Sequence, residues 1–498
     1  MLFCSKEFLF IFLPIFLVIY YLVPVKFKNI ILFVGSIVFY AVGELKYVPL
    51  IISSLVVNYI VAIFIEGCKI QNRLEGIDDN SKKNIFMIVA LLYDFGILFV
   101  FKYFTFFTGI KSSLTLPLGI SFYTFQIVSY VIDVYKDKIR AEKNIINLGV
   151  YLMMFPQLIA GPIVIYSDIA RQVRRRSYSL EKFEDGIKVF TLGLGAKMII
   201  ANMLGSCWTT AQMYGIEGMS TPMAWVAMFA YTFQIYFDFY GYSLMAIGLG
   251  LMLGFTLPKN FDNPYMSRSA TEFWRRWHIT LGTWMKDYIF YPMSLSKKMN
   301  KFGKWGKKHF GNTFGRTLPI CFANIVIFFI VGIWHGAAWK YIAYGLYNGF
   351  IIAISNLLEP VYKKLLNKFH INATSRGWTL WQIIRTFILV NIGWYFDMAD
   401  SVSQALCMIR WSIQGLSFSQ LNSSLLDLGI EARDYIIIIA GCIIVFIISV
   451  LKEKGIAIRE SIAAKPLAVR WIAYYALIAV ILIFGYIGAT QGFIYANF

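Results

Sequence analysis

Charged residues are scarce in this chain. Asp, Glu, Lys and Arg together make up 15% of its 498 residues, whereas hydrophobic residues make up 58%. A soluble globular protein has about 25% charged and about 45–50% apolar residues. The polar surface is therefore too small to coat a water-soluble particle, and the chain needs lipid as part of its solvent. The same composition excludes disordered, collagen-like and disulfide-rich secreted proteins.

Cysteine is also scarce, and no metal-ligand or nucleotide motif is present. The six cysteines are scattered, with no C-x-x-C spacing and no cluster of ligands. We therefore expect neither a disulfide framework nor a zinc site, and no tightly bound cofactor. The sequence lacks G-x-x-x-x-G-K-[ST], which argues against a nucleotide-binding loop, and G-x-S-x-G, which argues against a serine hydrolase.

Acidic residues are fewer than basic ones, so the formal net charge is +19. The excess is concentrated in three segments, residues 136–143, 171–176 and 297–308. Cationic loops held on the cytoplasmic side of a bilayer are the usual cause of such an excess. We expect these loops to contact lipid head groups and not nucleic acid, with a polyanion-binding site as the alternative.

Apolar runs long enough to cross a bilayer recur along the chain. Because lipid offers no hydrogen bonds to the backbone, they predict helices. The sequence therefore predicts an all-α polytopic membrane protein, a single domain of residues 1–498 with about 10–13 membrane elements, some of them re-entrant. The runs lie near residues 8–25, 30–43, 48–65, 85–107, 116–134, 148–165, 187–203, 223–257, 318–337, 339–358, 381–396, 435–451 and 468–486.

Residues 262–312 form a different kind of segment, too polar to cross a bilayer but rich in aromatic and basic residues. Phe273, Trp277, Leu281 and Trp284 recur at helical spacing. This pattern predicts an amphipathic helix at the cytoplasmic membrane interface, followed by a long lysine-rich loop.

Two of the four histidines stand in unusual surroundings. His335 lies between Trp334 and Gly336 at the end of an apolar run, where an ionisable side chain is a functional candidate. A neutral imidazole at that depth could act as a general base, and the alternative is a histidine hydrogen-bonded between helices. His278 follows Trp277 in the aromatic segment, where a structural role is the alternative.

Four acidic residues also fall within apolar runs or directly after one. They could form a proton or ion pathway, as in a transporter, or they could pair with basic residues or cap helices. Spacing alone leaves both readings open. These residues are Asp94, Asp133, Asp238 and Asp397.

Several sequence blocks resemble the membrane-bound O-acyltransferase superfamily, most of all its alginate O-acetyltransferase branch. The match rests on Trp277-His278-Ile-Thr-Leu-Gly and Trp334-His335-Gly336, with further blocks in family order. Leu244, where many alginate-type members have Asp, and Tyr291-Pro-Met-Ser, in place of a proline–leucine–glycine–glycine turn, depart from the pattern. The further blocks are residues 1–14, 117–126, 130–135, 155–163, 166–169, 236–243, 287–288 and the closing 493–498.

The resemblance implies a helical bundle with a central funnel or channel, His335 as the catalytic histidine and His278 as a second histidine beside the channel. It also implies an acyl thioester donor, acetyl-CoA or an acyl carrier. Arg275 and Arg276 could meet donor phosphates. The residues expected to line the channel are Trp334, Gly336, Trp277, Trp284 and Asp287.

The expected function is transfer of acetyl groups across the cytoplasmic (inner) membrane, for O-acetylation of an exported alginate- or cellulose-like polysaccharide. The resemblance implies an extracytoplasmic SGNH-type acyltransferase as a partner and allows for a polysaccharide synthase complex as another. D-alanyl transfer to teichoic acid is one alternative. A transporter of an acyl or polymer intermediate is another.

Overall fold

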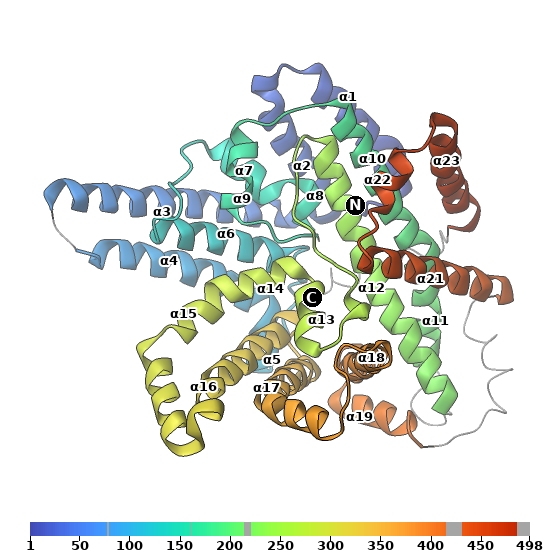
Figure 1. The fold of residues 1–498 in the computed structure, drawn as a ribbon. Helices are drawn as coiled ribbons and strands as arrows, with labels where there is room; N and C mark the ends of the chain where they lie inside the picture. The colour runs from blue at the N-terminus through green and yellow to red at the C-terminus, as the bar shows by residue number, and fades with distance from the viewer. Residues whose placement is uncertain (77–78, 160, 214–220, 415–430, 486–498) are drawn as a thin grey trace. The chain divides into compact units, whose positions relative to one another are not determined.

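The computed structural model describes residues 1–76, 79–159, 161–213, 221–414 and 431–485. Within these ranges every regular element is a helix, and no strand occurs (Figure 1). The predicted all-α fold is thus confirmed. The closing block at residues 493–498, which contributes to the family resemblance, lies outside the described residues.

Bilayer-length helices recur through the described part of the chain. Eight helical segments there are long and apolar enough to cross a membrane, and Phe8–Leu22 is a shorter apolar one. Many large apolar side chains on them are exposed, for example Ile436 and Leu482. Such surfaces are stable only against lipid, so the chain is a multi-pass membrane protein. The eight segments are Val25–Glu75, Ser81–Thr108, Leu180–Thr210, Thr221–Met252, Lys297–His335, Trp339–Lys368, Ala432–Glu453 and Leu467–Phe484.

The described helices group into two compact units, which share helix α12 (Thr221–Met252). The first unit comprises Met1–Lys197 and Phe239–Pro258. It contains α1 (Leu13–Leu22), α2 (Lys28–Glu44), α3 (Val48–Glu75), α4 (Ser81–Leu98), α5 (Phe104–Thr108), α6 (Ile120–Tyr135), α7 (Ile145–Met153), α8 (Phe155–Leu158), α9 (Tyr166–Arg174), α10 (Leu180–Gly195) and the end of α12.

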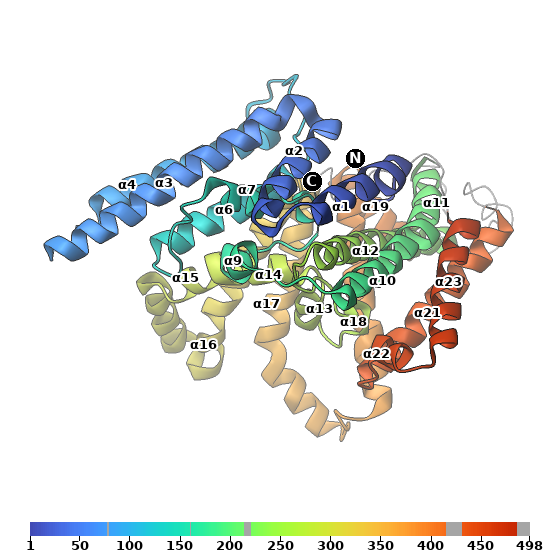
Figure 2. The same ribbon diagram turned by 90° about the horizontal axis from the view of Figure 1, so that it is seen from above.

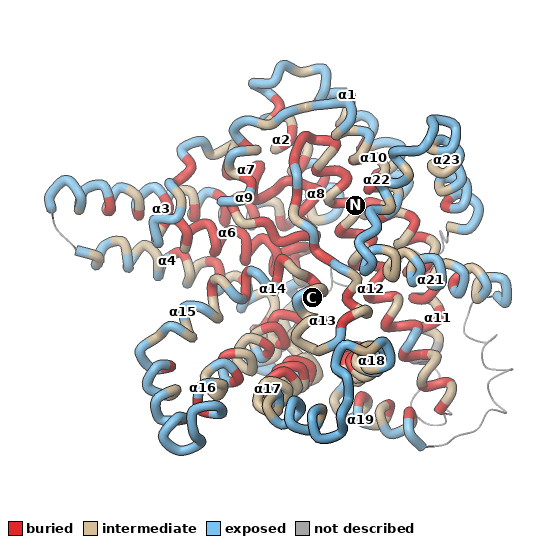
Figure 3. The backbone as a smooth tube through the Cα atoms, in the orientation of Figure 1, coloured by how far each residue is buried: buried red, intermediate tan, exposed pale blue. Residues whose placement is uncertain are grey.

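In the first unit α3 and α4 run side by side, and α6 packs against both of them (Figures 1 and 2). Figure 3 shows α6 and the neighbouring α7–α8 region as mostly buried, whereas the far ends of α3 and α4 are exposed. The core of this unit therefore forms around α6 to α8. Two turns of α10 also approach α12 closely, because a Cβ on Gly193 would lie 2.5 Å from the Gly241 carbonyl oxygen.

Residues 148–165, predicted as one apolar span, instead form α7, α8 and an extended stretch before α9. The helix stops at Met154, whose ψ of 114° is not helical, and Pro156 restarts it in a new direction. Gly161 has a φ of 138°, a backbone conformation that side chains disfavour. The apolar residues here are buried against protein and not lipid, which is why their composition imitates a span.

The second unit comprises Met198–Asp238 and Lys259–Gly488. Its core is a close pair of helices, α16 (Lys297–His335) and α17 (Trp339–Lys368), with α18 (Arg376–Met398) beside α17. A Cβ on Gly345 would lie 2.2 Å from the Phe328 carbonyl oxygen, so glycine permits this close packing. The other helices are α11 (Asn202–Met213), the start of α12, α13 (Ala270–Arg276), α14 (Ile279–Met285), α15 (Tyr291–Ser294), α19 (Val402–Trp411), α21 (Ala432–Glu453), α22 (Ile458–Ala463) and α23 (Leu467–Phe484).

The segment predicted as a lysine-rich loop is helical. It forms the first part of α16, which begins where the Ser296 hydroxyl accepts a hydrogen bond from the Met299 amide at 3.2 Å. At Gly311 the backbone leaves the helical region (φ 75°), and the chain folds back so closely that a Cβ on Gly315 would lie 2.2 Å from the Lys307 nitrogen. Lysine is a good helix former, so the loop prediction was wrong because charge density was taken as a sign of irregular structure.

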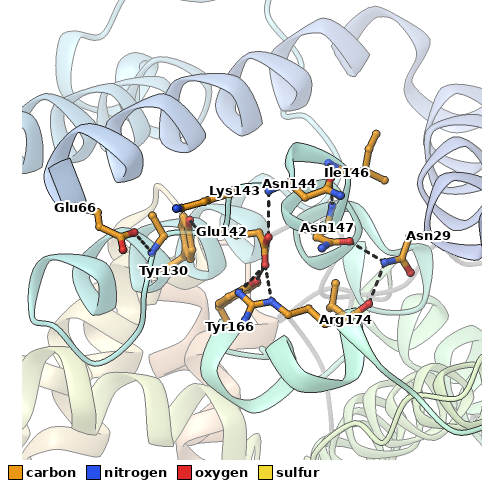
Figure 4. Close-up of polar contacts among 12 residues, drawn as sticks. Asn29, Glu66, Tyr130, Glu142, Lys143, Asn144, Ile146, Asn147, Tyr166 and Arg174 are labelled. Carbon is orange, nitrogen blue, oxygen red and sulfur yellow. Dashed lines mark hydrogen bonds and ion pairs between the residues drawn. The ribbon is translucent and has the colours of Figure 1, made fainter. Parts of the chain in front are cut away.

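A buried carboxylate fixes the loop between α6 and α7 in the first unit (Figure 4). Glu142 is 5% exposed, and its carboxylate accepts hydrogen bonds from the Tyr166 hydroxyl, the Asn144 amide and both Nε and Nη2 of Arg174 (3.0 and 2.8 Å). Burial raises the pKa of Glu142, but hydrogen bonds from Tyr166, Asn144 and Arg174 outweigh it, so the pKa lies below its ordinary value.

We expect Glu142→Gln to lower the free energy of unfolding by about 1.5–3 kcal/mol at pH 7, since it weakens charge-assisted hydrogen bonds to a buried group. Because the folded-state pKa is depressed, this contribution is present above the unfolded-state pKa and is lost as the pH falls through the folded one. Thermal unfolding of the purified protein in detergent, from pH 7 down into acid, should show the gap to wild type narrowing.

Glu184→Gln provides the matched control, because Glu184 pairs with Lys188 on the exposed surface of α10. That variant should unfold within about 1 kcal/mol of wild type. Equal free energies of unfolding for the two variants at pH 7 would contradict the structural role of Glu142.

Candidate active site

The predicted amphipathic helix is interrupted at the histidine it was expected to carry. Helix α13 ends at Arg276 and α14 begins at Ile279. Between them Trp277 is extended and His278 is left-handed, with φ 43° and ψ 55°. A residue other than glycine in that region costs on the order of 1–3 kcal/mol and needs support from its surroundings. The four apolar positions predicted to share a face are all buried against other parts of the protein: Phe273, Trp277, Leu281 and Trp284.

Asn260 supplies the support at this break. Its side-chain oxygen accepts hydrogen bonds from the Thr280 amide (3.3 Å) and hydroxyl (2.9 Å), and its backbone carbonyl accepts from the Ile279 amide (2.9 Å). The same side-chain oxygen lies 3.0 Å from Nδ1 of His278. Since that oxygen accepts from Thr280, Nδ1 is the protonated nitrogen of a neutral His278, and Nε2 carries the lone pair.

His278 is kept neutral by its position. The side chain is 3% exposed and lies outside the bilayer-length helices. Burial, and next the nearby His335, lower the pKa of His278 well below its ordinary value. At neutral pH this imidazole therefore offers an acceptor nitrogen and not a positive charge.

His335 is the last residue of α16 and is 2% exposed. Its Nδ1 lies 3.4 Å from Oδ1 of Asp397, near the end of α18. The Tyr231 hydroxyl donates to the other Asp397 oxygen at 2.6 Å, and Lys340 donates to the Asp397 backbone carbonyl at 3.2 Å. The Asp397 carboxylate is thus held beside Nδ1 of the imidazole.

Aromatic rings surround the two histidines. The Trp334 ring lies between them, with centroid distances of 6.0 Å to His278 and 5.3 Å to His335. Tyr344 lies 5.0 Å from His335 and stacks on Trp394 at 5.7 Å. These rings are almost completely buried, and they exclude water from the histidines.

The remaining predicted site residues lie at varying distances from this centre. Trp277 joins the aromatic cluster through Trp394, at 5.1 Å. Gly336 leaves room for the Tyr341 ring, since a Cβ there would lie 2.3 Å from it. Trp284 is buried and packs on Tyr288 at 5.2 Å, farther along the chain from the histidines.

Three predicted residues have no contact with either histidine among the described residues. Asp287 is partly exposed in the π-helical turn Lys286–Phe290. Arg276 forms ion pairs with Glu272 (2.7 Å) and Glu453, which neutralise it. Arg275 is exposed, and its Nε donates to a backbone carbonyl of its own helix.

The sequence did not identify the groups that hold the histidines in place. Asp397 stood out only as an acidic residue in an apolar run, and Asn260, Tyr231 and Lys340 carried no signal. No group of three or more potential metal ligands occurs in the part of the chain that the structure describes. What the arrangement offers is two buried imidazoles in a dry, aromatic site, which suits proton transfer to and from a hydroxyl.

Comparison with known proteins assigns this site to a family. The membrane-bound O-acyltransferase family matches residues 138–398, a range that contains both histidines, Asn260 and Asp397. A probable alginate O-acetylase of Azotobacter vinelandii is 33% identical over 447 residues, which is 85% of this chain and 81% of that protein.

Two further relatives have other acceptors in their names. The peptidoglycan O-acetyltransferase of Helicobacter pylori is 30% identical over 472 residues, covering 85% of this chain and 82% of that protein. A teichoic acid D-alanyltransferase of Streptococcus thermophilus is 30% identical over 257 residues, only 50% of this chain and 59% of that protein. The family match and the extent of these similarities lead to one conclusion: the chain belongs to the membrane-bound O-acyltransferase family and is a multi-pass membrane acyltransferase.

Proposed function

We propose that this protein passes acetyl groups from a cytoplasmic thioester donor across the membrane for O-acetylation of an exported polysaccharide, with His335 as general base. The observation that carries the proposal is the buried contact of His335 with Asp397, at 3.4 Å, inside the family match. Relatives named for alginate and peptidoglycan O-acetylation, similar over 85% of the chain, support the acetyl group and the polymer acceptor.

The proposed chemistry needs one proton to move twice. Nε2 of His335 takes the proton of the acceptor hydroxyl while its oxygen attacks the thioester carbonyl carbon. When the tetrahedral intermediate collapses, the carbon–sulfur bond breaks and the proton returns to the leaving thiolate. Asp397 stabilises the imidazolium that exists between the two steps, through the proton on Nδ1.

His278 has a different role in this proposal. Its Nδ1 proton faces Asn260, so Nε2 accepts a hydrogen bond and orients the hydroxyl for attack. Burial and the neighbouring His335 disfavour its charged form, and for this reason we assign the base to His335. Trp334, Trp277, Trp284, Gly336 and Asp287 are proposed to belong to the wall of the reaction channel.

The proposal also names the thioester donor and the partner enzyme. Acetyl-CoA or an acyl carrier would supply the thioester, and the exposed Arg275 is the predicted cation still available for donor phosphates. An extracytoplasmic SGNH-type acyltransferase would complete transfer to the polymer. D-alanyl transfer is less well supported, because similarity to the teichoic acid enzyme covers half of the chain.

A transporter relay is also less well supported. Acidic residues in the apolar runs have separate local partners: Asp94 accepts from Ser54 and Asn58, and Asp133 pairs with Lys138. Asp397 contacts His335 and accepts a hydrogen bond from Tyr231. Each of these three carboxylates thus has its own local partners, which suits structure or positioning better than passage of an ion along a chain of sites.

His335→Ala should abolish O-acetylation of the exported polymer, because no other group at this position can take the hydroxyl proton. Ester-linked acetate in the isolated polysaccharide measures the effect, and immunoblotting of membranes checks that the protein is still inserted. His370→Ala, at an exposed position, is the control and should keep normal acetylation. Wild-type acetate levels in the His335 variant would refute its role as base.

Asp397→Asn should lower kcat by about 10²–10⁴-fold with little change in KM, since the carboxylate stabilises a charge that exists only during reaction. Tyr231→Phe should produce a smaller loss, because it removes one hydrogen bond to that carboxylate. The measurement is steady-state acetyl transfer by protein in proteoliposomes, with the exposed Asp400→Asn as control. A pure KM effect would instead place Asp397 in donor or acceptor binding.

A further inference from the structure

A cluster of basic residues without acidic partners lies at one corner of the first unit, where α1, α2 and the α9–α10 connection meet. Lys28 begins α2 and is only 6% exposed. Its ammonium lies 3.8 Å from the ring centroid of Tyr178, 4.6 Å from Tyr21 and 4.9 Å from Tyr20. The rings fix the position of the charge, but their weak cation–π attraction does not neutralise it.

Arg176 is fixed in the same corner. Its Nε and Nη2 donate to the Tyr20 hydroxyl, at 3.1 and 2.9 Å, and its guanidinium lies 4.3 Å from the Phe255 ring centroid. Tyr20 in turn donates to the Leu253 carbonyl at 2.9 Å. The guanidinium is therefore held by neutral oxygens and an aromatic face, and none of these carries a negative charge.

Lys182 is the third cation, and it donates to the Gly254 carbonyl at 2.6 Å. The positive charge of Arg176 repels the like charges of both Lys28 and Lys182. Among the described residues, no carboxylate forms an ion pair with any of them. Other basic side chains of this unit do have such partners, as Arg174 has Glu142 and Lys69 has Asp137.

Three neighbouring charges, one of them almost fully buried, are costly unless an anion balances them. The chain around the cluster exposes large apolar residues, namely Leu22 (80%), Val25 (70%) and Leu180 (88%). Cations beside exposed apolar side chains are typical of a protein surface at the level of lipid head groups. The cluster also includes the end of the 171–176 segment, which the charge pattern assigns to the cytoplasmic side.

We propose that Lys28, Arg176 and Lys182 form a binding site for a phosphate group, supplied by the head group of an anionic membrane lipid. The guanidinium and the two ammonium groups would donate to the phosphate oxygens, and Leu22, Val25 and Leu180 would contact the acyl chains. Phosphate carried by a soluble molecule shares this chemistry and is the other possible source. The proposal is independent of acetyl transfer, because it concerns binding alone.

The test measures binding of the purified full-length protein to nanodiscs or vesicles of stated composition. The probes are phosphatidylglycerol, phosphatidylcholine as the zwitterionic reference, and coenzyme A as a soluble phosphate ligand. Wild-type protein should retain phosphatidylglycerol over phosphatidylcholine by native mass spectrometry. Lys28→Gln with Arg176→Gln should weaken that preference by about tenfold or more, since each cation near the surface contributes about fivefold.

Lys26→Gln with Arg175→Gln is the matched control, because both residues are exposed neighbours with the same charge. It should keep the preference within about twofold. Lys182→Gln, at a partly exposed position, provides a milder variant should the double substitution impair folding, which thermal unfolding would reveal. It should weaken the lipid preference by about fivefold.

The outcomes separate the two sources of phosphate. Loss of phosphatidylglycerol retention alone supports the lipid site, and loss of coenzyme A binding alone moves the site to a soluble ligand and overturns the lipid assignment. Unchanged binding of both probes in the double and Lys182 variants overturns the site itself. Equal losses in the control variant would also overturn it, because they would mean unspecific attraction to the basic face.

Discussion

The cost of placing an ionisable side chain among apolar helices governs this structure, because a charge removed from water must find a partner inside the protein. Glu142 is held by Tyr166, Asn144 and Arg174, and Asp397 is held by Tyr231 beside His335. In both places a tyrosine hydroxyl donates a hydrogen bond to the carboxylate, and a tyrosine can itself be buried at little cost. The two places differ in what stands opposite: an arginine that completes a structural anchor, or a histidine that can exchange a proton.

The same cost explains why the helices break where they do. A histidine inside an uninterrupted apolar helix would face its own turn or lipid, whereas both histidines here stand at a helix end. His335 closes α16, and His278 lies in the left-handed residue between α13 and α14, stabilised by Asn260. The interruptions aim each imidazole at a common aromatic surface, Trp334. Strain in the backbone is therefore offset by hydrogen bonds that also select the tautomer.

Basic side chains without acidic partners mark a different kind of site. The formal excess of +19 suggested a cytoplasmic face, but some basic side chains, such as Arg174 and Arg276, pair with acidic ones. Lys28, Arg176 and Lys182 do not: tyrosines hold Lys28 and Arg176, and a backbone carbonyl holds Lys182. The net charge of the whole chain thus indicates orientation in the membrane, whereas a binding site requires several basic side chains to lie close together in the folded protein.

Composition and apolar run length alone determined that this is an all-α membrane protein, because lipid accepts only helices whose backbone is satisfied internally. Local motifs further singled out His278 and His335, since imidazoles next to tryptophan in apolar sequence are rare. Sequence could not show that the apolar run at residues 148–165 contains the short buried helices α7 and α8, because burial against protein and burial in lipid demand the same residues. The lysine-rich segment is helical as well, although its dense charge suggested a loop. Nor could sequence alone pair His335 with Asp397, 62 positions apart, or His278 with Asn260. Those contacts exist only once α16, α18 and the α13–α14 break have packed, because hydrogen-bond partners are chosen by distance in space and not along the chain.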